Sequence, residues 1–264
     1  MDRIYEVLKK VREISPLVHH ITNWVTISDC ANIVKVFGGS PVMTHACEEA
    51  ADMTSIADAV VINIGTLDNN ILEAMQQAMS AANQKGIPIV IDAVGVGATK
   101  YRNDKIKELL QYKVAVLKGN ASEIASTAGI GVSTKGVDSG KVSGDIIQIA
   151  KSLAYERGCV VVVTGEKDIC TDGSSVVTIK NGSPMMSQIV GMGCMAGSVV
   201  GTFCAVEDNY LFASVAGLVC FEIAAENADA MSEGPGTFKV KMFDKIGALS
   251  DMSIDKMKKL EEIK

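Results

Sequence analysis

The stretch AVVINIGTLDNNILEAMQQAMSAANQKGIPIVIDA, residues 59–93, predicts a helix between two buried strands. Its two ends, Ala59–Gly65 and Pro88–Ala93, are short, apolar and rich in β-branched residues, as buried strands are. Between them, apolar residues recur at the spacing of one helix face, at Ile71, Met75, Ala78 and Ala82. Strands joined through a helix form a crossover connection, so we expect them to be parallel and covered on both faces.

The same alternation continues on both sides of this stretch. Further buried strands are expected at Pro41–Thr44, Val114–Gly119 and Val160–Gly165. A helix before the last of these is marked by Ile146, Ile149, Ala150 and Leu153. Two short strands, 168–171 and 174–180, are separated by Asp172-Gly173, which predicts an antiparallel hairpin at the sheet edge.

The last third of the chain changes character. After Gly197 the pattern is helical, over Ser198–Val206 and Tyr210–Met231. No linker, low-complexity run or fixed-period repeat interrupts the sequence. We therefore predict one α/β domain over residues 1–264, with a mainly parallel central sheet between two layers of helices.

Composition narrows the functional classes. Apolar residues make up 48% and charged residues 21% of the 264, which indicates a globular chain rather than a disordered one. The formal net charge is -6 and there is no basic stripe, so no nucleic-acid partner is expected. The longest apolar stretches, such as Leu211–Ile223, fall short of a membrane span and contain Glu222.

The seven cysteines favour a reducing compartment. Their number is odd, no C-x-x-C pair occurs, and the three histidines are not clustered with them as a zinc site requires. Residues 1–14 form a charged amphipathic pattern rather than a signal peptide. We expect a cytoplasmic protein with free thiols and no membrane partner.

Polar or glycine-rich residues follow almost every predicted strand. They are Thr44-His45, Gly65-Thr66, Asp92 with Gly95-Val-Gly97, Lys118-Gly-Asn120 and Thr164-Gly-Glu-Lys167. Ligands of open α/β sheets bind beyond the carboxyl ends of the strands, so the set predicts a long cleft there. Turn chemistry alone is the alternative for any single one of these glycines.

The segment Gly191-Met-Gly-Cys-Met-Ala-Gly197 is the strongest single element. We interpret it as a loop that opens a helix, whose free N–H groups and dipole could hold a phosphate. A tight turn without a ligand remains the alternative. A dinucleotide-binding loop is disfavoured because no strand with an acidic end follows, and a Walker A loop because no Gly-Lys-Ser/Thr follows.

Four residues at or near these segments could take part in proton transfer or in binding a cation. Cys194 lies in the first turn of the expected helix, where its pKa is expected to be lowered, although an inert core thiol is the alternative. Asn120 and Glu123 have the spacing of a capping box, or could serve Mg²⁺ on nucleotide phosphates. Asp92 ends an apolar strand and needs a cation or hydrogen-bond partner there.

Together these segments resemble the hydroxyethylthiazole kinase family of the ribokinase-like superfamily. The resemblance covers nearly the whole chain, and its motifs occur in the family's order: His20-Ile-Thr-Asn-Trp-Val25, Ser40-Pro-Val-Met-Thr-His45, Asn63-Ile-Gly-Thr66, Asp92–Thr99, Lys118–Ile124, Val163–Asp168 and Gly191–Gly197. The most specific feature is Cys194 after Gly-x-Gly, where most ribokinase-like enzymes carry Asp.

The resemblance implies a ribokinase-like fold and an ATP-dependent kinase for 4-methyl-5-(2-hydroxyethyl)thiazole, working with Mg²⁺ in thiamine synthesis and salvage. It implies homotrimers with sites between subunits. Cys194, Gly193 and Gly191 would form the catalytic loop, and Met43, Asn23 and Gly191 would bind the thiazole. Lys118, Thr164 and Asn120 would bind ATP, with Asp92 and Glu123 in the metal region.

Two positions depart from the family pattern. Lys118 stands where the family usually has Arg, which keeps the charge but loses bidentate phosphate geometry. Ala93 stands in place of the usual Pro. Another ribokinase-like kinase, of hydroxymethylpyrimidine or pyridoxal type, and a nucleotide-binding regulatory protein without catalysis remain the alternatives. A dehydrogenase is a distant third.

Overall fold

Within the part of the chain that the structure describes, nine strands form one sheet, in the order β2-β1-β3-β4-β5-β6-β7-β8-β9. The computed structural model describes residues 3–130 and 144–263. The strands are β1 Leu17–Ile21, β2 Ser40–Met43, β3 Ala59–Asn63, β4 Ile89–Asp92, β5 Val116–Asn120, β6 Val160–Thr164, β7 Asp168–Thr171, β8 Val176–Ile179 and β9 Leu260–Ile263. Neighbours from β2 to β6 pair in parallel and those from β6 to β9 pair antiparallel, as the mainly parallel prediction requires.

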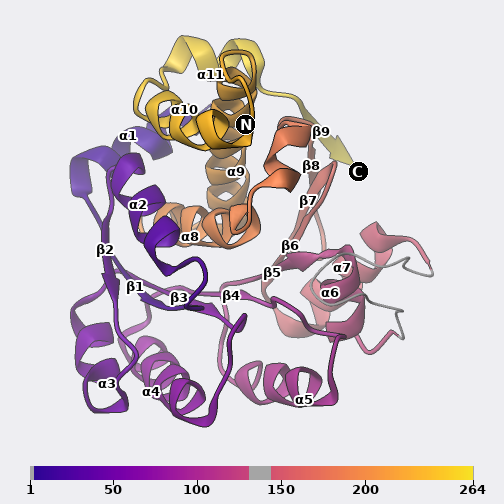
Figure 1. Ribbon diagram of the computed structural model, residues 1–264. Coiled ribbons are helices and arrows are strands. Elements are labelled where there is room, and N and C mark those ends of the chain that lie inside the picture. Colours follow the sequence, from indigo (N-terminus) through magenta and orange to yellow (C-terminus); the bar gives the residue numbers. More distant parts are fainter. Residues whose placement is uncertain (1–2, 131–143, 264) are drawn as a thin grey trace.

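Helices cover both faces of the sheet, which makes three layers (Figure 1). One layer holds α3 Cys47–Ile56, α4 Asn69–Lys85, α5 Lys100–Leu109, α6 Ala121–Thr127 and α7 Ile146–Arg157. The other holds α1 Ile4–Ile14, α2 Ile27–Phe37, α8 Met192–Cys204, α9 Tyr210–Asp229, α10 Pro235–Gly247 and α11 Asp251–Met257. A short 3₁₀ turn, η1 Pro184–Gln188, precedes α8.

Alternating side chains of the parallel strands fill two separate cores. In β3, Val60 and Ile62 pack with α4, whereas Val61 packs toward α8 and α9. A strand buried on both faces must be apolar at successive positions, because its side chains alternate between them. This explains why the predicted strands appear in the sequence as unbroken β-branched runs.

Two strands were not predicted. Neither β1, where His19 and His20 interrupt the apolar pattern, nor β9, which contains two glutamates, is among the strands that the sequence predicts. His19 is buried because its two ring nitrogens meet Thr54 Oγ1 at 2.8 Å and Thr44 Oγ1 at 2.6 Å. Burial and the charge of His45 lower the pKa of His19 to about 4, so the ring is neutral and structural.

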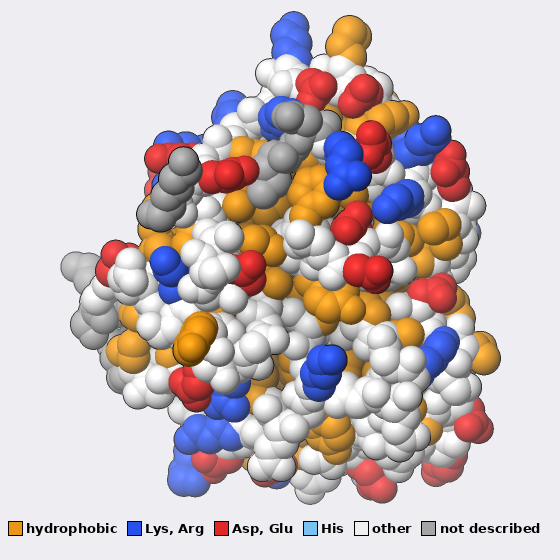
Figure 2. Space-filling view, turned by 180° about the vertical axis from the view of Figure 1, so that it is seen from behind, with side chains coloured by type: hydrophobic (Ala, Val, Ile, Leu, Met, Phe, Trp, Pro, Cys, Tyr) orange, Lys and Arg blue, Asp and Glu red, His pale blue; other side chains and the backbone are white. Residues whose placement is uncertain are grey.

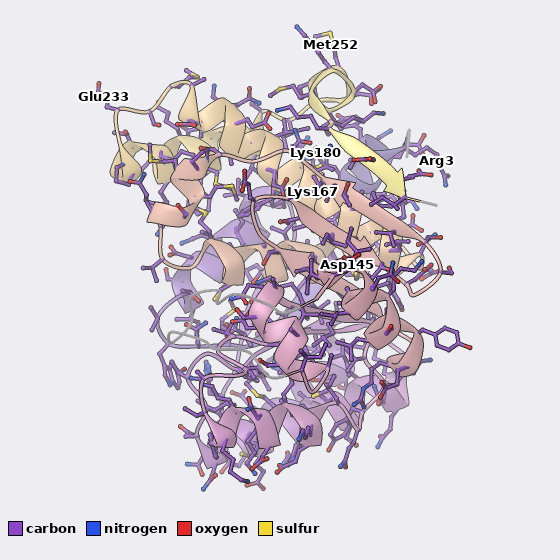
Figure 3. The ribbon with its side chains drawn as sticks, turned by 90° about the vertical axis from the view of Figure 1, so that its right-hand side faces the viewer. Arg3, Asp145, Lys167, Lys180, Glu233 and Met252 are labelled. Atoms are coloured by element: carbon purple, nitrogen blue, oxygen red, sulfur yellow. The ribbon has the colours of Figure 1, made fainter. Side chains whose placement is uncertain are left out.

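The last strand, β9, pairs with β8 in spite of its two glutamates. Glu261 Oε2 lies 3.6 Å from Lys167 Nζ and 3.1 Å from Lys180 Nζ. Figure 3 shows both lysines beside this part of the sheet. Surface ion pairs contribute little each, so backbone pairing is the main reason that this short strand is ordered.

Helix α8 lies unusually close to the sheet. A Cβ placed on Gly201 would collide with the side chain of Val61 in β3, and one on Gly197 would lie 3.2 Å from Asp92 Oδ2 in β4. On the other side of α8, Gly217 of α9 admits Val199 and Phe203. The glycines at positions 193, 197 and 201 share one helix face, which lets the helix backbone approach the strands.

Helix α9 is long and apolar enough to cross a membrane, but 78% of its most apolar window is buried inside the structure. It packs against α8, α10 and the strands, so its apolar surface belongs to the core. On the face seen in Figure 2, acidic and basic side chains are intermixed over the coloured surface rather than gathered into a basic stripe.

We expect Gly201→Ala to destabilise the fold, because its Cβ would meet Val61 in an already filled core. Overpacking of this kind costs about 1–3 kcal/mol. Gly236→Ala is the matched control, since a Cβ there meets nothing within 4 Å in α10. Urea denaturation of both variants checks this. Equal free energies of unfolding for the two would contradict the close contact.

Candidate active site

Polar side chains at the ends of three neighbouring strands form a row. In register, Asn63 of β3 is the partner of Asp92 of β4, and Asp92 is the partner of Lys118 of β5. Register partners in parallel strands point to the same face, and two residues earlier the same face carries Val61, which packs toward α8. The row therefore lies under α8, at the carboxyl edge where the cleft was predicted.

Lys118 joins the sheet to the start of α8. Its Nζ donates to Asp92 Oδ1 at 3.0 Å and to the carbonyl oxygen of Gly193 at 2.9 Å. The two charged side chains are 4% and 0% exposed. Burial alone would lower the pKa of Lys118, but the charges of Asp92 and Glu123 outweigh burial and raise it, so the lysine stays protonated.

The segment expected as a loop that opens a helix lies mostly inside that helix. Residues 192–197 form the first turns of α8, which agrees with the first-turn position expected for Cys194, and Gly191 stands before them as the N-cap. Gly191 has φ +96°, and a Cβ there would lie 2.7 Å from Thr26 Cγ2, so only glycine fits. The N–H groups of Met192, Gly193 and Cys194 thus point out of the first turn of a 13-residue helix, where they lack partners within the helix.

The space next to Gly193 is adjacent to a positive charge. Gly193 is exposed, and a Cβ there would lie 3.2 Å from Lys118 Nζ. An anion at this glycine would meet free N–H groups, the positive end of the helix dipole and the ammonium together.

Cys194 accepts a hydrogen bond from Asn23 Nδ2 at 3.4 Å. The expected lowering of its pKa is wrong. Burial and the charge of Asp92 raise the pKa of Cys194, and the opposing effects of Lys118 and of hydrogen bonds from Thr26 and Asn63 do not compensate. Cys194 is therefore a protonated thiol in the absence of substrate, and once ionised it is a stronger base than an ordinary thiolate.

The Asn120–Glu123 pair forms the capping box that its spacing indicates. Asn120 Oδ1 accepts from the Glu123 N–H at 3.0 Å, and Glu123 Oε2 accepts from the Asn120 N–H at 2.7 Å. Glu123 Oε1 also accepts from the Gly95 N–H at 2.7 Å, which ties together the loops after β4 and β5. Burial raises the pKa of Glu123.

Thr164 lies at the end of β6, in register with Asn120, and its Oγ1 donates to the carbonyl oxygen of Gly119 at 3.4 Å. The turn that follows is held by Asp168 Oδ1, which accepts from the Gly165 N–H at 2.8 Å. Asp168 shares a hydrogen bond with Glu222 of α9, a residue without any sequence signal for such a role. Burial and the charge of Asp168 raise the pKa of Glu222 well above its usual range.

Met43 ends the edge strand β2, opposite His20 of β1. It is half-buried and lies at the same sheet edge as Asn63, two strands away. Of the residues predicted for the site, the structure bonds Asn23 to Cys194, and Lys118 to both Asp92 and Gly193. Asn63 connects these two groups, although the sequence marked it only as part of a motif.

Comparison with known proteins identifies similar chains over the full length. A model of the hydroxyethylthiazole kinase family matches residues 8–252. The hydroxyethylthiazole kinase of Methanosarcina mazei is 49% identical, over 97% of this chain and 98% of the relative.

Solved structures agree with this match. The hydroxyethylthiazole kinase protein of Pyrococcus horikoshii matches with a TM-score of 0.92 and 39% identity, covering 100% of both chains. A ribokinase-like superfamily protein of Enterococcus faecalis, at 11% identity, shares the fold with a TM-score of 0.63 over 88% of this chain and 86% of its own. The predicted ribokinase-like α/β/α fold is confirmed.

We expect Lys118→Met to destabilise the protein at pH 7, because Asp92 would be left buried without its counterion. Breaking one partner of a buried pair costs about 3–5 kcal/mol. The double variant Lys118→Met/Asp92→Asn is the control and should recover part of that loss. Free energies of unfolding in urea measure both.

The stability of the Lys118→Met variant should also depend on pH in a definite direction. Without Lys118, the folded-state pKa of Asp92 rises further above its unfolded value, so stability is retained at acid pH and lost as pH rises through the folded pKa. The loss relative to wild type should therefore be smaller at pH 4 than at pH 7. A pH-independent loss would contradict a charged Asp92–Lys118 pair.

Proposed function

The chain belongs to the hydroxyethylthiazole kinase family and is a kinase, and we propose that the site under α8 performs its phosphoryl transfer. The reaction phosphorylates the primary alcohol of 4-methyl-5-(2-hydroxyethyl)thiazole. ATP is the expected phosphoryl donor. The observation that carries the proposal is the start of α8, where free N–H groups, an exposed glycine and Lys118 Nζ surround one position.

The γ-phosphoryl group would lie at that position. Phosphoryl transfer depends mainly on positioning and on stabilising the charge of the equatorial oxygens, so a pre-formed anion site supplies most of what the protein needs. The N–H groups of Gly191–Cys194 would bind those oxygens. Lys118 would add a positive charge on the side of the sheet and would keep its hydrogen bond to Asp92.

The remaining ATP contacts are proposals from the family resemblance. Thr164 and Asn120 end neighbouring strands β6 and β5 and lie in register, so one phosphate chain could contact both. Lys118 is already bonded to Asp92 and Gly193, which supports a role beneath the phosphate rather than as a free arm. Its compact ammonium suits this confined position, whereas a bidentate Arg would need more room.

The carboxylates suit Mg²⁺ held through water. Both oxygens of Asp92 and both of Glu123 already accept protein hydrogen bonds, and among residues 3–130 and 144–263 no three His, Cys, Asp or Glu side chains form a direct metal cluster. Two carboxylates beside the single ammonium of Lys118 nevertheless favour a cation, and Mg²⁺ keeps several waters when bound. When bound, Mg²⁺ would neutralise phosphate oxygens.

The acceptor alcohol would lie between Cys194 and the phosphoryl group. Its oxygen attacks the γ-phosphorus while the bond from that phosphorus to the β-phosphate oxygen breaks, which releases ADP. The alcohol proton would pass to the Cys194 sulfur in those protein molecules whose thiol has first lost its own proton to water, since a thiol that keeps its proton cannot accept another. Because the transition state is loose, a base contributes less here than the anion site does. Asn23, which contacts Cys194 Sγ, would bind next to the alcohol.

Three further properties are proposed. A homotrimer with shared sites is supported by Trp24 and Val25, which are 54% and 68% exposed beside Asn23, and by Met43 on the edge strand. Met43 would then contact the thiazole from a site completed by a neighbour. The seven free cysteines support a cytoplasmic location. The thiazole phosphate would be used in thiamine synthesis and salvage.

The direct test is ATP-dependent phosphorylation by the purified protein with Mg²⁺. We expect turnover of hydroxyethylthiazole, with kcat/KM well above that for hydroxymethylpyrimidine or pyridoxal. ADP release coupled to product mass measures this. Preference for either other alcohol would replace the substrate assignment, and ATP binding without turnover of any alcohol would indicate a regulatory protein.

Two variants compare how much the anion site and the base each contribute to kcat. Gly193→Val fills the space beside Lys118 Nζ and should lower kcat by about 10²–10³-fold. Cys194→Ala removes only the proton acceptor and should lower kcat by less than Gly193→Val does. Steady-state kinetics of variants with wild-type Tm measures both. Near-normal turnover of Gly193→Val would count against the anion site.

A further inference from the structure

Asn63 connects the charged row to the catalytic cysteine. It ends β3 and is 3% exposed. Its Nδ2 donates to Asp92 Oδ2 at 3.0 Å, and its Oδ1 accepts from Asn23 Nδ2 at 2.9 Å and from the Gly65 N–H at 3.0 Å. Three hydrogen bonds thus hold one side chain in place.

The chemistry of the partners fixes which way this amide faces. An ionised Asp92 can only accept, so the donor end of Asn63 must face it, and the carbonyl end must face the Gly65 N–H, which can only donate. The close packing of Gly65 allows no alternative. A Cβ on Gly65 would lie 2.9 Å from Asn23 Cβ and 3.0 Å from Asn63 Oδ1.

The fixed amide in turn orients Asn23. Because Asn63 presents a carbonyl oxygen, Asn23 must turn its NH₂ group toward it, and the same NH₂ group reaches Cys194 Sγ at 3.4 Å. The carbonyl oxygen of Asn23 faces Thr26, accepting from its N–H at 3.0 Å and its Oγ1 at 3.1 Å. The polarity of the chain from Lys118 to Cys194 is therefore set at each link.

A donor at the sulfur favours the thiolate over the thiol, since hydrogen bonding to a charged form stabilises it. Hydrogen bonding by Asn63 is itself among the effects that lower the pKa of Cys194 against burial. Lys118 acts in the same direction, and Asp92 in the opposite one.

We propose that Asn63 is a positioning residue, which aligns Asn23 with the Cys194 sulfur and so prepares that sulfur to accept the alcohol proton. The inference rests on the proposed phosphoryl transfer for its role in turnover. The orientation of Asn23 at the Cys194 sulfur does not depend on a substrate, so it can be tested in the free protein.

The test is the pH dependence of iodoacetamide alkylation at Cys194 in the intact protein without ATP or thiazole, followed by peptide mass spectrometry. Cys47, which is partly exposed in another part of the fold, is an internal control for general reactivity. In Asn63→Leu, the pH midpoint of alkylation at Cys194 should rise by about one unit. At a fixed pH below the midpoint, alkylation should therefore be about tenfold slower. The midpoint at Cys47 should not move.

A second variant separates the donor effect from simple packing. Asn63→Ser keeps a shorter donor and acceptor and should show a smaller shift than Asn63→Leu. In an Asn23→Leu background, Asn63→Leu should shift the midpoint by less than it does alone, because the part of its effect that passes through Asn23 is already lost. If Asn63→Leu folds and its Cys194 midpoint is unchanged, the proposal is overturned. If Asn63→Leu does not fold, unchanged Cys194 midpoints in both Asn63→Ser and Asn23→Leu overturn it.

Turnover gives an independent readout. The pH profile of kcat in the Asn63 variants should move up with the alkylation midpoint. Should wild-type protein prove inactive on hydroxyethylthiazole while the Cys194 midpoint still shifts, the proposed substrate fails and the positioning role stands. A shift in neither quantity removes the positioning role and leaves the kinase activity of the family untouched.

Discussion

The direct contact between the backbone of α8 and the sheet is the constraint on which the rest of the site depends. Glycines at 193, 197 and 201 leave no side chain between this helix and strands β3, β4 and β5. The helix N-terminus consequently lies just above the strand ends, where Lys118 reaches the carbonyl of Gly193. A larger residue at position 197 or 201 would press on Asp92 or Val61 and push this helix away from the charged row. The glycines thus determine the geometry of the site as well as the packing of the core.

Two opposite charges, on Asp92 and Lys118, are buried where α8 contacts the sheet, and they allow only one arrangement of the strand ends there. Asp92 is fully buried and would be strongly unfavourable without Lys118 and Asn63, so the three residues are required together. Asn63 and Asp92 are the last residues of β3 and β4, and Lys118 lies two residues before the end of β5. The sheet register therefore determines both the charge balance and the direction of every hydrogen bond that leads to Cys194.

Much of this arrangement was predictable from the sequence, and the remainder depended on pairing that a sequence does not contain. Apolar β-branched runs identified β2 to β6 and the β7–β8 hairpin, whereas β1 was missed because the threonines that satisfy His19 are distant in sequence. The strand ends indicated the cleft, and family resemblance supplied candidate roles. Register was needed to find that Lys118 pairs with Asp92 and that Asn63 connects them to Asn23. The pKa of Cys194 was mispredicted because the helix terminus was considered without the burial that accompanies it.

The two outermost strands, β2 and β9, carry the open backbone edges of the sheet. Exposed edges of this kind invite pairing with strands of other molecules. In β2 the edge contains Pro41, which has no N–H to offer, and in β9 it contains Glu261 and Glu262, whose charges would face like charges in a second copy. The charges of β9 and the missing N–H of Pro41 in β2 thus make both open edges of the sheet poor templates for pairing with a second copy.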